Sequence, residues 1–292
     1  MHLLNADLHS HSTCSDGSLA PAELAARAHR NGVALWALTD HDDISGLPEA
    51  RATAQALGMA FVTGVEVSVS FAGETVHILG FGFDDHNPEL QAGLAQVRSG
   101  RRARAQAMGD SLARAGIPGA YEGACALAPN PELVSRTHFA RFLVQQGHCA
   151  QVHEVFQRFL KEGKPGFVSH QWAGLGDALR WIHQAGGVAS IAHPARYPYS
   201  PTVEYALFSE FKAHGGQGVE VVCGSHNAAD VERVTGLARE FGLKASRGSD
   251  FHSPTESRID LGQLPDLPGV LTPLWSDWAV ARLADEQRRQ LA

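Results

Sequence analysis

The chain has 292 residues, of which 44% are hydrophobic and 19% are charged. This ordinary globular composition excludes disordered and fibrous proteins, and the length allows one large domain or two. A net charge of -7 and a pI near 6.1 argue against binding to duplex DNA, which needs a basic face, but are compatible with a small anionic substrate held by metal ions.

The N-terminal segment and the cysteines predict a cytoplasmic protein. His2, Asp7, His9 and His11 stand where a secretory signal would need an apolar run. The cysteines form no CxxC pair, so we interpret them as free thiols of a reducing compartment. No segment reaches the roughly 18 apolar residues that a membrane span needs, and we expect no membrane partner.

The first predicted strand, over 3–12, carries side chains that are typical metal ligands. Asp7, His9 and His11 occupy alternate positions, so on a strand they project from one face. A turn at Ser15, Asp16 and Gly17 would end this strand. Taken alone, the His-x-His pattern fits a metal site and ordinary polar side chains equally well, since short motifs often mislead.

The next elements alternate between helix and strand. Hydrophobic spacing and Pro and Gly boundaries predict a helix over 21–32, a strand over 33–39, a helix over 47–57, and strands over 60–70 and 75–83. Strands separated by helices favour a parallel sheet with crossover helices.

The middle of the chain has a different character. From about residue 88 to 164 it is rich in Ala, Arg, Leu and Gln at helical spacing, with no convincing strand. We interpret 99–164 as a helical insertion that covers the site, and 1–98 with 165–292 as one catalytic unit. We expect Arg101, Arg102 and Arg104 to form a solvated helix face, from which Arg104 can reach a substrate phosphate.

After the insertion the alternating pattern resumes. We predict strands over 166–169, 187–194, 218–223 and 244–246 and helices over 176–185, 203–214 and 228–241. Imidazoles and carboxylates follow several strands, as in Ala192-His193-Pro194 and Ser249-Asp250-Phe251-His252.

These side chains together form a nitrogen and oxygen ligand set without thiolates, which suits zinc, manganese or iron. The set exceeds what one ion can use, so we expect two or three divalent ions, with manganese as the first choice and zinc or iron as alternatives. In a parallel α/β barrel such residues gather at the carboxyl ends of the strands. The candidate ligands are His9, His11, Asp16, His41, Glu66, His77, His193, Asp250 and His252.

Six short motifs in this order resemble the polymerase and histidinol phosphatase (PHP) family of metal-dependent phosphoesterases. The resemblance covers the chain except the insertion, and it implies an α/β fold, a distorted seven-stranded (β/α) barrel of PHP type. The motifs are Asp7-Leu8-His9-Ser10-His11, Thr39-Asp40-His41-Asp42, Gly64-Val65-Glu66, Val76-His77-Ile78, Ala192-His193-Pro194 and Ser249-Asp250-Phe251-His252.

The resemblance also implies a role for each ligand. Glu66 would bridge two ions. The ligand groups would be His9, His11 and Asp250 for one ion, His77 and His193 for the next, and Asp16, His41 and His252 for a third. Some family members carry His where this chain has Asp16.

Within the family, a barrel with a helical insertion is similar to enzymes that remove the 3'-phosphate from nucleoside 3',5'-bisphosphates, such as pAp to AMP. We expect a metal-activated hydroxide to attack phosphorus, with Glu66 and Asp250 holding the ions. His193 or His252 would protonate the leaving oxygen. Asp7 would orient a ligand imidazole by accepting its second N–H.

Substrate contacts are expected from the insertion and from the loop after His193. Ser135 is a plausible cap of a helix whose free N–H groups, with Arg136 and His138, would bind a phosphate. The alternative is a capped surface helix with solvated charges. Arg196 is a second candidate because it follows the ligand His193 closely.

Three other functions compete with this one. A 5'-to-3' exoribonuclease on short RNA would use the same attack next to a nucleotide 3'-oxygen. A histidinol-phosphate phosphatase would have no use for a nucleotide-sized insertion. A noncatalytic, metal-stabilised module usually has a partner domain or lacks some ligands, whereas this set is complete.

Overall fold

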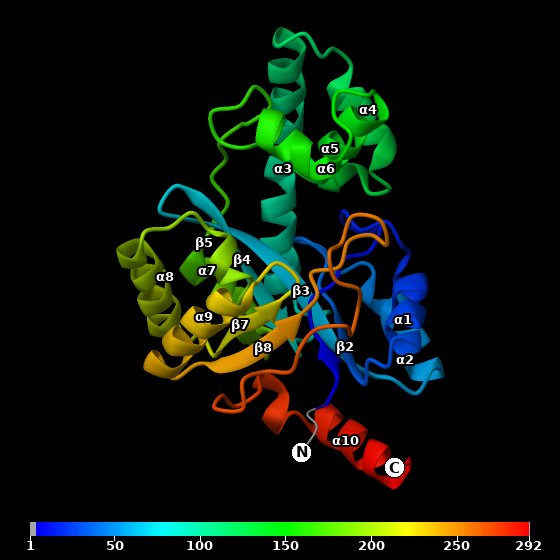
Figure 1. The fold of residues 1–292 in the computed structure, drawn as a ribbon, viewed down its shortest axis with the longest axis vertical. Helices are drawn as coiled ribbons and strands as arrows, with labels where there is room; N and C mark the ends of the chain where they lie inside the picture. Colours follow the sequence, from blue (N-terminus) through cyan, green and yellow to red (C-terminus); the bar gives the residue numbers. More distant parts are fainter. Residues whose placement is uncertain (1–3, 292) are drawn as a thin grey trace.

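The strands form a nearly closed barrel, as predicted (Figure 1). A computed structural model describes residues 4–291, in which one eight-stranded sheet runs in the order β1-β2-β3-β4-β6-β7-β8, with β5 paired to β3 off this path. Leu8 N–H donates to the carbonyl of Arg247 at 3.0 Å, so the sheet returns to its first strand. The strands are β1 (Ala6–Asp7), β2 (Leu35–Leu38), β3 (Ala60–Phe71), β4 (Glu74–Phe81), β5 (Ala173–Gly174), β6 (Val188–Ile191), β7 (Gly218–Cys223) and β8 (Lys244–Gly248).

One strand does not follow the parallel pattern of the others. β4 runs antiparallel to both β3 and β6, whereas the other pairs are parallel. The reason is local: Ala72 and Gly73, both with positive φ, join β3 to β4 in a tight turn. A parallel crossover needs a dozen or more residues, and this turn leaves no room for one.

Helices surround the barrel and close one end of it. They are α1 (Pro21–Arg30), α2 (Leu47–Ala56), α7 (Leu175–Gln184), α8 (Pro201–Ala213), α9 (Ala228–Glu240) and α10 (Ala279–Leu291), with the short helices η3 (Pro194–Arg196) and η4 (Leu274–Asp277). Trp36, Phe81 and Phe208 are fully buried between strands and helices. Helix α10 was not predicted, and it lies at the end of the barrel remote from α4 and α5 (Figure 1).

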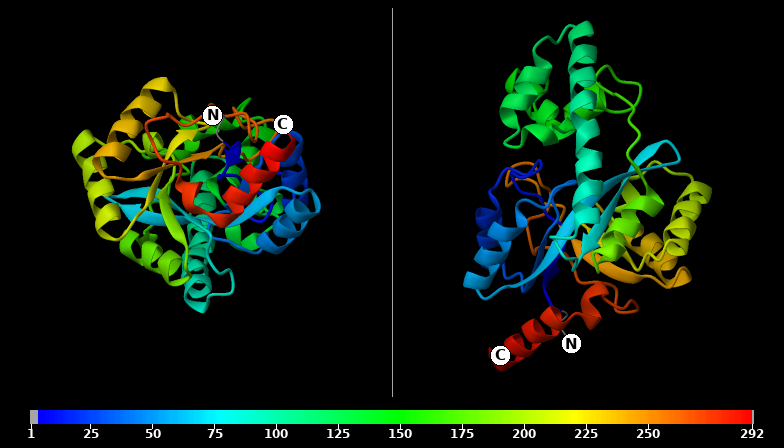
Figure 2. Two further views of the ribbon diagram at one scale, coloured as in Figure 1. Left: turned by 90° about the horizontal axis from the view of Figure 1, so that it is seen from below. Right: turned by 180° about the vertical axis from the view of Figure 1, so that it is seen from behind.

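Residues 99–164, which we call the cap, lie above the other end of the barrel. The helices of this region are α3 (Pro88–Arg114), α4 (Ala120–Leu127), η1 (Pro131–Leu133), α5 (Arg136–Gln145), α6 (Val152–Val155) and η2 (Phe156–Leu160). Helix α3 extends from the barrel into the cap (Figure 2). Its Leu90 and Leu94 pack in the barrel core, whereas Met108 and Leu112 pack in a second core within the cap. No helix in the described range, α3 included, is long and apolar enough to cross a membrane.

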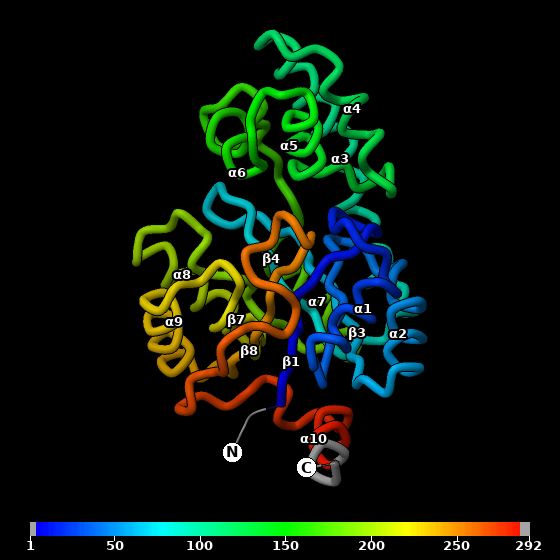
Figure 3. Tube along the Cα trace, turned by 45° about the vertical axis from the view of Figure 1, so that its right-hand side comes forward, coloured from blue at the N-terminus to red at the C-terminus, as the bar shows by residue number. Residues whose placement is uncertain are grey.

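Two predicted strands need correction. The segment 166–169 is not a strand, and regular strand pairing begins only at β5. The carbonyl of Val168 accepts a hydrogen bond from Arg104 Nε at 3.1 Å instead of from a neighbouring strand. The first strand is much shorter than 3–12, because only Ala6–Asp7 pairs regularly, and Leu3 lies outside the described residues. The loops that follow β1 and β8 lie directly below the cap, so the carboxyl ends of these parallel strands face it (Figure 3).

Candidate metal centre

All of the predicted metal ligands lie at the cap-facing end of the barrel. They fall into overlapping groups whose possible ligand atoms lie within 4.8 Å of one another. Parallel strands deliver the residues after their carboxyl ends to one place, and the antiparallel β4 contributes His77 directly across from Ser68 of β3. The other ligands are His9, His11 and Asp16 after β1, His41 after β2, Glu66 within β3, His193 after β6, and Asp250 and His252 after β8.

The first group is formed by His9, His11 and Asp250, with Glu66 beside the two imidazoles. The atoms concerned are His9 Nε2, His11 Nε2, Glu66 Oε2 and Asp250 Oδ1, and five of their separations lie between 3.1 and 3.4 Å. Ligands at roughly 2.0 to 2.2 Å from a tetrahedral ion lie about 3.3 to 3.6 Å apart. His9, His11 and Asp250 therefore have separations that suit ligands of one cation, and Glu66 Oε2 lies 3.3 Å from both imidazole nitrogens.

The second group uses the other oxygen of Glu66. Oε1 lies 3.0 Å from His77 Nδ1 and 3.0 Å from His193 Nε2, and these two nitrogens are 3.4 Å apart. Glu66 is completely buried. One carboxylate thus faces two separate sets of imidazoles, which is the arrangement expected of a bridging ligand.

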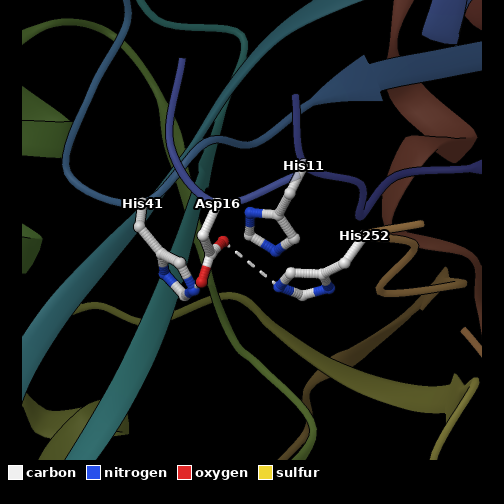
Figure 4. Close-up of side chains that lie close together, drawn as sticks. All are labelled: His11, Asp16, His41 and His252. Carbon is white, nitrogen blue, oxygen red and sulfur yellow. Dashed lines mark ion pairs between the residues drawn. The ribbon is translucent and has the colours of Figure 1, made fainter. Parts of the chain in front are cut away.

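A third group surrounds Asp16. Figure 4 shows the rings of His41 and His252 on either side of the Asp16 carboxylate, with His11 beside them. Asp16 Oδ1 lies 3.3 Å from His252 Nε2 and 3.8 Å from His41 Nε2.

Unpaired buried atoms support the fit to metal ions. Glu66 Oε2 and Asp16 Oδ1 are buried without a hydrogen-bond partner among the described residues, as are Nδ1 of His11, His41 and His193. His41 Nδ1 lies only 2.9 Å from Glu66 Oε2, yet the two atoms do not have hydrogen-bond geometry. Leaving the two carboxylate oxygens unpaired is unfavourable, and a cation beside each of them would compensate it.

Outer contacts fix the orientation of two ligand rings. His9 Nδ1 lies 3.0 Å from Glu220 Oε1, and His252 Nδ1 lies 2.9 Å from the carbonyl of Asp250. An N–H donated through Nδ1 leaves the Nε2 lone pair for a metal. Glu220 was not predicted; its sequence signal is a single carboxylate inside the apolar strand Gly218–Cys223.

Asp7 has a different partner from the predicted one. Its carboxylate accepts backbone N–H bonds from Ser249 at 2.9 Å and from Gly262 at 2.8 Å, rather than a bond from an imidazole. Burial raises the pKa of Asp7. Asp7 therefore fastens β1 to the segments after β8, while Glu220 contacts the ligand ring.

Three residues in or beside the site have strained backbone. Asp42, His193 and Asp250 have φ values of 52°, 28° and 55°, in the left-handed region that L-residues rarely adopt. Such conformations cost on the order of 1–3 kcal/mol and persist where the surroundings hold them. His193 N–H donates to Glu220 Oε2 at 2.7 Å, and Asp250 N–H donates to the carbonyl of His9 at 2.8 Å.

A pocket between the ligands and the cap has a cationic wall. Arg104, Arg136 and Arg196 line it, together with Phe156 and Trp172. Burial, and then the nearby charges of Arg136 and Arg101, lower the pKa of Arg104 to about 9. Burial and neighbouring arginines also lower the pKa of Arg136. This crowding of cations favours an anionic ligand.

Of the other residues that were predicted to contact the substrate, some line the pocket and others are buried in the core. Ser135 lines the pocket, caps α5 by accepting from Thr137 N–H at 3.1 Å, and donates to Asp16 Oδ2 at 3.0 Å. His138 is fully buried and does not line the pocket; its Nδ1 accepts from Ser135 N–H at 3.0 Å, and burial lowers its pKa to about 4. Arg101 was expected in solvent but is buried.

Comparisons with known proteins agree with this geometry. The PHP domain family matches residues 7–172. A 3',5'-nucleoside bisphosphate phosphatase of Chromobacterium violaceum is 50% identical over 94% of this chain and 96% of that protein. A 5'-3' exoribonuclease of Haemophilus influenzae is 43% identical over 92% of this chain and 97% of that protein.

A solved structure is also similar along nearly the whole chain. It is described as an amidohydrolase from Chromobacterium violaceum with bound sulfate and no metal, and it is 49% identical. The TM-score is 0.91, with 97% of this chain and 96% of that chain covered.

Glu66→Gln tests the shared carboxylate. The amide keeps the side-chain shape but loses the charge that both ligand groups use, so we expect metal affinity to fall by more than the 10- to 100-fold that is typical of outer contacts. Metal content after equilibrium dialysis measures this, with circular dichroism as the check on folding. The control is Glu232→Gln on the exposed face of α9. Full metal content in Glu66→Gln would contradict the bridging role.

Metal binding should strengthen as the pH rises. Burial lowers the pKa of His11, but the carboxylates of Asp250 and Glu66 raise it to about 10 in the protein without metal. A ligand imidazole must be neutral, so an ion has to displace this proton at any pH below about 10. We expect calorimetry at pH 7 and 8.5, in buffers of different ionisation enthalpy, to show proton release and tighter binding at the higher pH. Equal affinity without proton release would be inconsistent with a protonated His11.

Proposed function

The chain belongs to the PHP domain family, and on this basis we propose that it is a metal-dependent phosphatase that hydrolyses the 3'-phosphate of nucleoside 3',5'-bisphosphates. One observation carries the proposal. The same pocket has clustered metal-type ligands on one side and arginines of the cap on the other. A small molecule with two phosphates matches both sides. The printed activity of the Chromobacterium violaceum relative supports this substrate.

The ligand groups would hold two or three divalent ions. Glu66 would be shared by the first two, and Asp16, His41 and His252 would hold the third. Manganese is our first choice because it accepts carboxylate and imidazole ligands, and zinc or iron also fits. When bound, the ions would supply Lewis-acid charge to phosphoryl oxygens and lower the pKa of a bound water to roughly 7.

The protein's own residues would position the substrate. Arg136, at the start of α5, would bind the second phosphate, since helix N-termini and guanidinium groups favour phosphate oxygens. Arg104 and Arg196 line the same pocket and would add positive charge. The leaving nucleoside oxygen needs a proton. Its proposed donor is His193 or His252, which both line the pocket, in a state in which the donating ring does not hold an ion.

A second candidate is 5'-to-3' hydrolysis of short RNA. A further pocket, with a cavity volume of about 250 Å³, adjoins the first and shares Asp250 and His252 with it. Its lining also includes Ser257 and Arg258. An RNA strand that continues beyond the phosphate held at the metal ligands would need an adjoining pocket. The printed name of the Haemophilus influenzae relative favours the same activity.

Phosphate release from a nucleotide panel tests the first proposal. We expect turnover of a 3',5'-bisphosphate and a 3'-monophosphate but not of a 5'-monophosphate. Arg136→Ala should raise the KM of the bisphosphate roughly 10- to 100-fold, the range of one charge-assisted bond, with little effect on the 3'-monophosphate. Arg102→Ala, an exposed cap arginine, is the control. An equal KM change for both substrates would show that Arg136 does not bind the second phosphate.

Arg258→Ala tests the second candidate. If the adjoining pocket binds the continuing chain, this variant should slow hydrolysis of a 5'-phosphorylated trinucleotide about tenfold, the effect of one lost phosphate contact, and leave bisphosphate turnover unchanged. Single-turnover rates on the two substrates provide the comparison. The assignment fails if the rate is unchanged on RNA, or if both rates fall together.

A further inference from the structure

The residue that follows the ligand His41 is held unusually firmly. Asp42 is fully buried and has a φ of 52°. Its Oδ1 accepts from Ser68 N–H at 2.7 Å, and its Oδ2 accepts from Ser68 Oγ at 2.9 Å. Ser68 lies two residues after Glu66 in β3 and directly across from His77 in β4. Asp42 is therefore bonded into the strands that carry two other ligands.

Two arginines of α3 clamp this residue. Arg98 Nη1 donates to the carbonyl of Asp42 at 2.7 Å, and Arg101 Nε donates to its carboxylate at 3.0 Å. The Arg101 Nη2 group contacts the same carboxylate and also donates to Ser68 Oγ at 2.9 Å. Arg98 and Arg101 lie three positions apart, so they share one face of the helix. Arg101 also stacks on Trp172, with its guanidinium carbon 4.8 Å from the ring centroid.

This clamp, formed by Arg98 and Arg101 around Asp42, acts on the backbone that carries His41. Asp42 N–H donates to the carbonyl of Glu66 at 2.9 Å, and Glu66 N–H donates to the carbonyl of Asp40 at 3.2 Å, with His41 between them. Removing Arg101 would leave the Asp42 carboxylate buried without its cation, which is strongly destabilising for the local geometry. A shift of Asp42 would then move the adjacent ring.

The cap contacts one ligand group more than the others. Ser135 of the cap donates to Asp16 Oδ2 at 3.0 Å, and Arg101 of the cap reaches His41 through Asp42. Asp16 and His41 belong to the third group, whereas the ring of His9 in the first group is held by Glu220 of the barrel. The third ion should therefore depend on the cap more than the first two.

We infer that Arg98 and Arg101 are positioning residues, which hold His41 through Asp42 and so couple docking of the cap to binding of the third metal ion. This inference rests on the metal centre of the proposed function but not on the identity of the nucleotide. Arg101 also lines the substrate pocket, so the test must separate positioning from substrate binding.

The test measures manganese binding without any substrate. Bound Mn²⁺ per chain is titrated by equilibrium dialysis and elemental analysis for wild type, Arg101→Met, Asp42→Asn and Arg102→Met. Arg102 is the matched control because it is the next residue of α3 and is exposed. We expect Arg101→Met and Asp42→Asn to weaken binding of one of the three ions, the one held by the Asp16 group, by about 10- to 100-fold as for other outer contacts of a metal site. Arg102→Met should match wild type.

Kinetics add a second readout. Impaired positioning predicts a lower kcat at limiting Mn²⁺ that excess Mn²⁺ restores. It also predicts that Arg101→Lys partly restores the affinity for Mn²⁺, because lysine keeps the positive charge but cannot form the two parallel hydrogen bonds of a guanidinium group. A substrate contact alone predicts a higher KM at every Mn²⁺ concentration. If Arg101→Met does not fold, the nearly isosteric Asp42→Asn and the variant Arg98→Met carry the same comparison.

Wild-type affinity for all ions in Arg101→Met and Asp42→Asn would overturn the inference. So would a wild-type protein that binds only two ions, since none would remain for the Asp16 group. Failure of wild type to release phosphate from any nucleotide would instead refute the proposed function, and the Mn²⁺ titration would still decide the role of the clamp.

Discussion

The buried carboxylate of Glu66 is the feature on which the rest of the site depends. A charge in a fully buried position is unfavourable unless other charges or hydrogen bonds compensate it. Burial alone would raise the pKa of Glu66, but the rings of His77, His9 and His41 hold it well below its usual value. Each oxygen of the carboxylate faces its own set of nitrogens, so one residue fixes the spacing of two ligand groups.

The barrel holds the ligands around this charge through residues that are not themselves ligands. Asp7 fastens β1 to the segments after β8, and Glu220 bonds both the ring of His9 and the backbone of His193. The left-handed backbone at His193 and Asp250 is the local cost of this arrangement. Neither Asp7 nor Glu220 contributes an atom to a ligand group, yet both decide where ligand atoms lie.

The cap supplies the opposite charge. Its arginines are crowded and partly desolvated, which lowers the pKa of Arg104 and of Arg136 and leaves the pocket ready for an anion. Helix α3 belongs to the core of the barrel at one end and to the core of the cap at the other. The same helix bears Arg98 and Arg101, so packing of the cap, charge in the pocket and geometry of His41 share one rigid element.

The amino-acid sequence by itself predicted alternating strands and helices and, through six motifs that resemble the PHP family, the barrel and the side chains that meet at its cap-facing end. Period-two alternation and strand-end polar residues are local properties of the chain, and strand direction then brings His9, His41 and His193 together. Tertiary structure alone decided that Glu220 contacts His9, that Arg101 is buried against Asp42, and that 166–169 is not a strand. These contacts join residues 211 and 59 positions apart, and no local pattern specifies which distant side chain compensates a buried charge.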